Sequence, residues 1–172
     1  TDWHLMHLGQ FAVSGVGLVM VEATGVSPEG RISPGCLGLW SDANQDALAR
    51  VVGFCKDYGN TTMGIQLAHA GRKASTDLPW YGGAPIPATD PRGWQTVAPS
   101  ATPYSDAFDA PTALDEAGMA KIADDFVSAA RRAEAIGFDV VEVHMAHGYL
   151  LHQFFSPLSN QRNDAYGGAL EG

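Results

Sequence analysis

Two histidines and a nearby tyrosine are the residues whose types and spacing best suit chemistry: His144, His147 and Tyr149. They follow directly on the short apolar run 140–143, which is typical of a buried parallel strand. In α/β folds, polar groups just after such a strand lie where the reacting groups are placed. Imidazole binds metals and donates hydrogen bonds, and a phenol can act as a general acid. These three side chains are therefore the first candidates for an active site.

The elements that must position these side chains alternate between helical and strand patterns. Ser41 or Asp42 is suited to begin the second helix, and Asp115 the third. Gly59 and Gly137 are suited to end them. The predicted helices cover about residues 1–14, 42–58 and 115–136, and the predicted strands cover residues 18–23, 62–67 and 139–143.

Helices that alternate with strands through short connections indicate βαβ units and a parallel sheet. Three strands cannot close a barrel, and an eight-stranded barrel takes about 250 residues. We therefore expect an α/β fold that is part of a (β/α)8 TIM barrel, about its second to fourth βα units, so that residues 1–172 are a partial domain of a longer protein. A small doubly wound sheet is the alternative, although no Gly-x-Gly-x-x-Gly turn follows any strand.

A long loop follows the second predicted strand, from about residue 68 to residue 114. It carries seven of the ten prolines of the chain, and neither a helical nor a strand period survives in it. Loops of that length inside compact domains are usually lids or binding loops. Trp80, Tyr81 and Trp94 either line a substrate lid or anchor the loop to the body of the protein.

Composition limits the partners of this chain. A net charge of −9 with only 10 scattered basic residues argues against nucleic acid and acidic membranes as partners, and leaves small molecules or other subunits. No apolar run approaches the ~18 residues that a membrane span needs. Cys36 and Cys55 are too few for a disulfide framework, so a cytoplasmic location fits best.

Three segments carry a resemblance to a known family. They are Gly-Leu-Val-Met-Val-Glu-Ala at 17–23, Gly-Ile-Gln-Leu-Ala-His-Ala-Gly-Arg-Lys at 64–73, and the long segment 144–168 that begins His-Met-Ala-His-Gly-Tyr. In this order they resemble the old yellow enzyme family, and most closely its bacterial xenobiotic-reductase branch. The resemblance covers nearly the whole chain apart from the loop around 77–111.

The resemblance implies a (β/α)8 barrel that binds FMN. Such an ene-reductase takes hydride from NADPH or NADH and passes it through FMN to the C=C bond of α,β-unsaturated carbonyls or related xenobiotics. Ala23 matches a backbone contact with the flavin, and Gln66 matches the amide that binds the pyrimidine edge of the flavin. The resemblance further implies that the full-length protein is a homo-oligomer.

Roles for the first candidates also follow from the resemblance. His144 and His147 match the pair that holds the carbonyl oxygen of the substrate, and Tyr149 matches the phenol that protonates the α-carbon. Negative charge grows on that oxygen as hydride arrives, and a pre-placed donor can stabilise it by roughly 3 kcal/mol.

Other polar residues are given structural or open interpretations. Glu22 lies inside an apolar strand, so we expect a buried ion pair. His69, Arg72 and Lys73 form a basic cluster that could meet an anionic cofactor group or a loop carboxylate such as Asp77, and the cluster is left unassigned. A polar turn network that shapes the last loop is expected at Asn160, Arg162, Asp164, Gly167 and Gly168.

Two other classes of function stay open. A zinc-dependent hydrolase would bind its metal through His144 and His147, with Glu142 or His152 nearby. A non-catalytic truncated homologue would only bind partners. The chain also lacks the opening strand and the later strands of the resembling family, and the phosphate sites of barrels commonly follow strands seven and eight.

Overall fold

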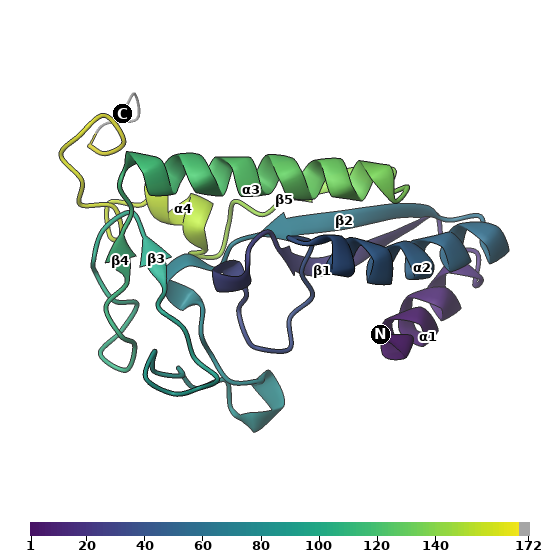
Figure 1. The fold of residues 1–172 in the computed structure, drawn as a ribbon, viewed down its shortest axis with the longest axis horizontal. Helices are drawn as coiled ribbons and strands as arrows, with labels where there is room; N and C mark the ends of the chain where they lie inside the picture. The colour runs from purple at the N-terminus through teal and green to yellow at the C-terminus, as the bar shows by residue number, and fades with distance from the viewer. Residues whose placement is uncertain (169–172) are drawn as a thin grey trace.

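The chain folds around a small parallel sheet with helices on one face and a long loop at one end (Figure 1). The computed structural model describes residues 1–168, and residues 169–172 lie outside the described part. The sheet has the order β1-β2-β5 with two parallel pairings, formed by Leu18–Gly25, Thr62–Ala68 and Val140–Val143. The predicted parallel α/β arrangement is confirmed.

Three helices pack on this sheet: α1 at Asp2–Ala12, α2 at Asp42–Tyr58 and α3 at Glu116–Ala135. The predicted caps of α2 and α3 are present. The Ser41 hydroxyl accepts a hydrogen bond from the Asn44 N–H at 3.2 Å, and the Asp115 carboxylate accepts one from the Gly118 N–H at 2.7 Å. Such caps satisfy N–H groups that the first turn leaves free and typically contribute ~1 kcal/mol.

Successive side chains of β2 point alternately to the core face of the sheet and to its opposite face. Met63, Ile65 and Leu67 are at most 1% exposed and pack in the main hydrophobic core with residues of α1, α2 and α3. Gln66 lies between two of these residues, so its side chain points to the opposite face. The face away from the helices is therefore the one on which a polar site can form.

Two strand predictions need correction. β5 was expected to be buried, yet Val140 and Val141 are each 40% exposed, because β5 is an edge strand and no strand within residues 1–168 covers its outer side. Glu22 was expected to be buried and is not, since its side chain is 56% exposed. It lies on β1, the other edge of the sheet, where the pairing register shifts between Val21 and Ala23. Glu22 lies 3.3 Å from the Nε2 atom of His4.

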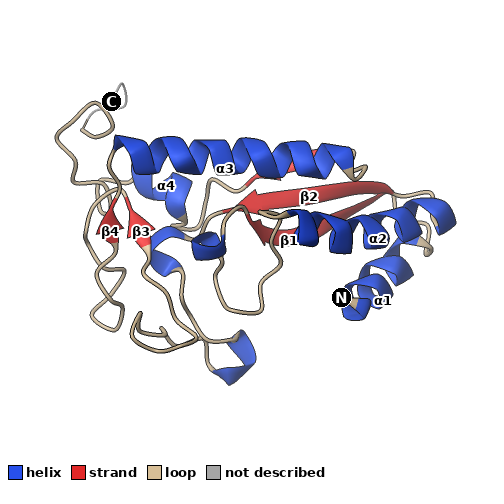
Figure 2. Cartoon of the chain, viewed as in Figure 1, coloured by secondary structure: helices blue, strands red, loops and turns tan. Residues whose placement is uncertain are grey.

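The long loop contains more structure than its sequence indicates. Two-residue strands in this loop, β3 at Val97–Ala98 and β4 at Thr112–Ala113, pair with each other. Outside the loop, a short helix, α4 at Leu150–Phe155, follows the candidate histidines. These elements lie beyond the carboxyl ends of β1 and β2, together with most of the irregular chain (Figure 2). Strands of two residues are too short to give a period, and neither was predicted.

The first helix also departs from expectation. Its broad apolar face is only partly covered, because Leu8 and Ala12 are buried whereas Trp3, Met6 and Phe11 stay exposed. None of the helices in the described part of the chain has the length and apolar character to cross a bilayer.

Candidate active site

Residues from all three strands form one row across the polar face of the sheet. In the register of the sheet Gln66 on β2 is paired with Ala23 on β1 and with Glu142 on β5. The amide nitrogen of Gln66 donates a hydrogen bond to the Glu142 carboxylate. The two residues expected to contact the flavin are thus neighbours, and Glu142, considered only as a zinc ligand, completes the row.

His144 lies directly beyond β5 and is buried. Its N–H donates to the carbonyl oxygen of Leu67 at 2.9 Å, which extends the pairing of the strands by one residue. The Ala146 N–H donates to Nδ1 of His144 at 3.2 Å, so Nδ1 is an acceptor and the proton of the neutral ring is on Nε2. Burial, and next the neighbouring His147, lower the pKa of His144 and favour this neutral form.

The three candidate rings gather beside one another. The centroid of the His144 ring lies 5.3 Å from that of His147 and 4.8 Å from that of Tyr149. His147 and Gly148 both adopt left-handed backbone conformations, with φ of 57° and 73°, and this tight turn folds the segment back on itself. Burial raises the pKa of Tyr149, so its phenol keeps its proton at neutral pH.

A buried glutamine that the sequence did not single out supports this turn. Gln153 on α4 is 1% exposed, and its amide nitrogen donates to the carbonyl oxygens of Gly148 at 2.7 Å and Ala70 at 3.3 Å. Its amide oxygen accepts from the Arg72 N–H at 3.4 Å. Gln153 therefore ties the segment after β2 to the segment after β5, and no spacing signal in the sequence marks it.

The basic cluster after β2 divides into three environments. His69 is buried, and burial lowers its pKa to about 4. Arg72 donates to the carbonyl oxygens of Thr102 and Pro103 at 3.1 and 3.2 Å. Lys73 donates to the carbonyl oxygen of His147 at 2.8 Å. None of the three meets a carboxylate within 4.0 Å in the described part of the chain, and Asp77 pairs instead with Arg92.

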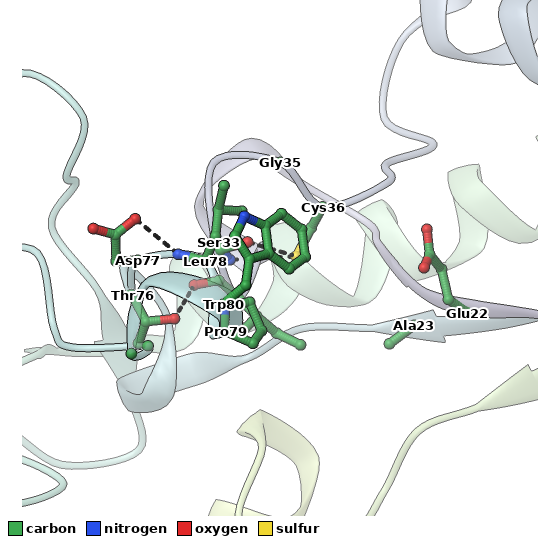
Figure 3. Close-up of a pocket in the computed structure, with 13 residues that line it drawn as sticks. Glu22, Ala23, Ser33, Gly35, Cys36, Thr76, Asp77, Leu78, Pro79 and Trp80 are labelled. Atoms are coloured by element: carbon green, nitrogen blue, oxygen red, sulfur yellow. Dashed lines mark hydrogen bonds between the residues drawn. The ribbon is translucent and has the colours of Figure 1, made fainter. Parts of the chain in front are cut away.

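A cavity of about 460 Å³ lies between the loop after β1 and the loop after β2 (Figure 3). Ala23 and Glu22 line one part of it, and Trp80 lines another. The side chains in its wall are mostly apolar, as is usual for sites that bind organic molecules. The cavity thus reaches the same row of residues as the candidate flavin contacts.

The aromatic residues of the long loop have different environments. Trp80 is 73% exposed at the cavity, and Tyr81 is exposed as well. Trp94 is half-buried, and its indole N–H donates to the carbonyl oxygen of Glu29 at 2.9 Å. Trp94 is therefore an anchor of the loop, whereas the position of Trp80 suits a lid.

The polar turn network expected after the histidines is present. Arg162 forms an ion pair with Asp164 and donates to the carbonyl oxygens of Pro99 and Leu114. Asn160 donates to the carbonyl oxygen of Phe154 at 2.9 Å. The contacts of Arg162 join the last loop to the long loop.

The zinc alternative gains no support from this geometry. Within residues 1–168, no three or more histidine, cysteine, aspartate or glutamate side chains converge as a metal site requires. His152, one of its proposed ligands, instead accepts a hydrogen bond from the Gly148 N–H through Nδ1 at 2.8 Å.

A parallel sheet with helices on one face and polar groups beyond its carboxyl ends defines the (β/α) class of enzyme folds. The whole chain, residues 1–172, matches the NADH:flavin oxidoreductase / NADH oxidase family, and the chain belongs to that family. It is 48% identical to an NADH:flavin oxidoreductase of Gibberella zeae, over 99% of this chain and 42% of that protein. It is 44% identical to an NADPH dehydrogenase of Geobacillus thermodenitrificans, over 98% of this chain and 45% of that protein.

Solved structures agree with this assignment. Morphinone reductase in complex with tetrahydroNAD superposes with a TM-score of 0.82 at 32% identity, over 98% of this chain and 47% of that one. The old yellow enzyme homologue of Zymomonas mobilis superposes with a TM-score of 0.81 at 34% identity, over 99% of this chain and 46% of that one. The chain therefore spans a little under half the length of the relatives it matches, and its sheet is part of a (β/α)8 barrel.

Proposed function

We propose that this chain is part of an FMN-dependent ene-reductase, an enzyme that uses NADPH or NADH to reduce the C=C bond of α,β-unsaturated carbonyls or related xenobiotics. Residues 1–172 would form part of its FMN-oxidoreductase barrel domain. The observation that carries the proposal is the adjacent placement of the Ala23–Gln66 row and the His144, His147 and Tyr149 rings at one end of the sheet, in a chain of the flavin oxidoreductase family.

The residues at the row fit a flavin ring. The pyrimidine edge of a flavin alternates hydrogen-bond donors and acceptors, and the Gln66 amide offers both. Ala23 is the small residue beside it and lines the cavity of about 460 Å³, so a planar ring can approach the backbone there. Gln66 and Ala23 would hold the ring edge, and FMN would supply the hydride chemistry.

The histidine pair would bind the carbonyl oxygen of the substrate. The Nδ1 atom of His144 already accepts the Ala146 N–H, which leaves the Nε2–H group as the free donor. Negative charge that develops on the oxygen meets a donor fixed in advance, and one such donor contributes roughly 3 kcal/mol. His147, with its ring 5.3 Å away, would supply the second donor.

Tyr149 would act as the general acid. Its ring is adjacent to that of His144, and its raised pKa keeps the proton on the phenol until the α-carbon becomes basic. The partners we propose are small molecules, with neither nucleic acid nor membrane, and the full-length protein is proposed to be a cytoplasmic homo-oligomer. The two cysteines, Cys36 and Cys55, are both free, which suits a reducing compartment.

The test uses the full-length protein that contains this chain. We expect bound FMN by absorbance and NAD(P)H oxidation that depends on cyclohexenone. His144→Ala/His147→Ala should keep the flavin and lose most of the turnover, on the order of a hundredfold for each donor removed. His7→Ala, which changes a histidine of α1, is the matched control and should leave turnover unchanged.

Other results would favour the alternative classes. A colourless protein with stoichiometric zinc would replace the proposal with a hydrolase. A protein with neither flavin nor zinc nor turnover would favour a non-catalytic homologue. A yellow protein whose double variant keeps full turnover would refute the clamp role of the histidines but not the flavin chemistry.

A further inference from the structure

One lysine lies against two of the three candidate residues and has no role in the proposed function so far. Lys73 ends the short 3₁₀ helix Gly71–Lys73 that follows β2. Its Nζ atom lies 2.8 Å from the carbonyl oxygen of His147, 5.0 Å from the ring centroid of Tyr149 and 5.1 Å from that of Tyr104. An ammonium group within about 6 Å of an aromatic face is attracted to that face.

The charge of Lys73 is not neutralised within the described part of the chain. No carboxylate there lies within 4.0 Å of it, although acidic residues outnumber basic ones by 19 to 10 in the sequence. Most other cations of the chain form such ion pairs, among them Lys56 with Asp139 and Lys121 with Glu29. Lys73 therefore has no carboxylate partner in that part of the chain, and its ammonium group lies over the ring of Tyr149.

The stem of Lys73 also packs against the turn that carries His147. A Cβ atom placed on Gly148 would lie 3.6 Å from Cδ of Lys73, and the left-handed backbone at His147 and Gly148 turns the His147 carbonyl toward the ammonium group. One side chain thus fixes the turn and places a charge beside the phenol.

We propose that Lys73 is a positioning residue that fixes the His147 turn and stabilises the phenolate form of Tyr149. The inference rests on the proposed function, in which FMN would supply the hydride and the α-carbon of the substrate would then need a proton from Tyr149. In the second step the Tyr149 O–H bond breaks and a C–H bond forms. The electron pair of the O–H bond stays on the phenolate, which water then re-protonates.

The electrostatic effect of Lys73 on Tyr149 can be distinguished from the effects of the other groups near the phenol. Lys73, from the segment after β2, and His144, from the segment after β5, lie beside the Tyr149 ring, and Cys36, from the loop after β1, is close enough to raise the pKa of the phenol. His144 is neutral over the range in which Tyr149 titrates, and a Cys36 thiolate would oppose phenolate formation. Lys73 is therefore the one cation among them, and its removal should disfavour the phenolate.

The experiment is a titration of Tyr149 in the full-length protein, followed by the ¹³Cζ resonance of labelled tyrosine and assigned with Tyr149→Phe. Lys73→Met should raise the apparent pKa of Tyr149 by about one unit or more, and Lys73→Arg should restore it. The control Arg131→Met, which removes a charge from the exposed face of α3, should leave that pKa unchanged. Lys73→Gln serves as a second neutral variant if the methionine variant does not fold.

Turnover gives an independent readout. Lys73→Met should lower kcat for enone reduction about tenfold with a smaller change in KM, and it should have little further effect in a Tyr149→Phe background. An unchanged Tyr149 pKa, or an equal loss of kcat in both backgrounds, would overturn the inference. The titration needs neither flavin nor turnover, so it gives an answer even if the proposed function fails.

Discussion

The side chain of Gln153 occupies the space that a Cβ atom on Gly71 would need. Such an atom would lie 2.5 Å from the amide oxygen of Gln153 and 2.6 Å from its nitrogen, and Gly71 has a φ of 60°. The contact explains why the segment after β2 can approach α4 so closely. Gly71 lies in the segment 64–73, which resembles old yellow enzymes. A glycine is needed there so that Gln153 can reach and hold the turn at His147.

The close contact between Gly71 and Gln153 makes Gly71 sensitive to substitution. Gly71→Ala in the full-length protein should lower the free energy of unfolding by roughly 2–4 kcal/mol, from backbone strain together with displacement of Gln153. Urea unfolding measures the change. Gly15→Ala is the control, because Gly15 also has a positive φ of 87° but has no atom within 4 Å of its Cβ position. Equal losses in both variants would show that strain alone is responsible.

Gln153 itself can be tested by removal of its polar atoms. Gln153→Leu leaves the carbonyl oxygens of Gly148 and Ala70 without their donor, and we expect a loss of roughly 2–3 kcal/mol in the free energy of unfolding. Under the proposed function the full-length protein should also lose turnover, because the turn at His147 is no longer held. Gln10→Leu, on the exposed surface of α1, should change neither quantity, and a stable Gln153→Leu protein would contradict this account.

His69 gives a prediction about pH. Its pKa is about 4 in the folded protein, below the ordinary value of 6.5, because burial disfavours the charged ring. Between these values the unfolded chain therefore binds more protons than the folded chain. The contribution of His69 to stability is fully present above pH 6.5 and is lost as the pH falls through 4. The stability lost between these two pH values amounts to roughly 3 kcal/mol.

Replacement of this histidine should remove that contribution. His69→Gln should make the free energy of unfolding less dependent on pH between about 4 and 6.5 than it is in the unaltered protein. Nearby carboxylates titrate in both proteins, so the quantity to compare is the difference between the two curves. Parallel curves for the two proteins would mean that His69 is not buried in its neutral form.

The proton of His144 provides a spectroscopic test. Nitrogen NMR of the labelled full-length protein should find Nε2 protonated and Nδ1 bare at neutral pH, with a titration midpoint below the ordinary histidine value of 6.5. The expectation follows from the Ala146 N–H at Nδ1 and from burial of the ring. A proton on Nδ1 at neutral pH would remove the free donor that the proposed carbonyl clamp needs.

Much of the scaffold could be predicted from the sequence because local signals were strong. The caps Ser41 and Asp115 and the regular apolar spacing set the bounds of α2 and α3 to within a residue or two. The parallel sheet followed from the alternation of elements. The three rings of the candidate site also come together as their spacing indicates, although their chemical roles stay predictions.

What the sequence did not indicate depends on long-range contacts. The exposure of β5 and Glu22 depends on which strands flank the sheet, and no local pattern contains that information. The strands β3 and β4 have two residues each and form only because distant parts of the loop meet. Gln153 looks like an ordinary helix residue until the fold brings Ala70 to it.

These ties have a consequence for the order of folding. Gln153 contacts Ala70 across 83 positions of the chain, and Lys73 contacts His147 across 74. Closure of such long loops carries an entropic cost before the contacts form, which slows the step. A nascent chain on the ribosome can complete α2 and β2 early, but it cannot fix the histidine turn until residue 153 has left the exit tunnel. The turn that carries the candidate rings is therefore fixed only after the scaffold that supports it has formed.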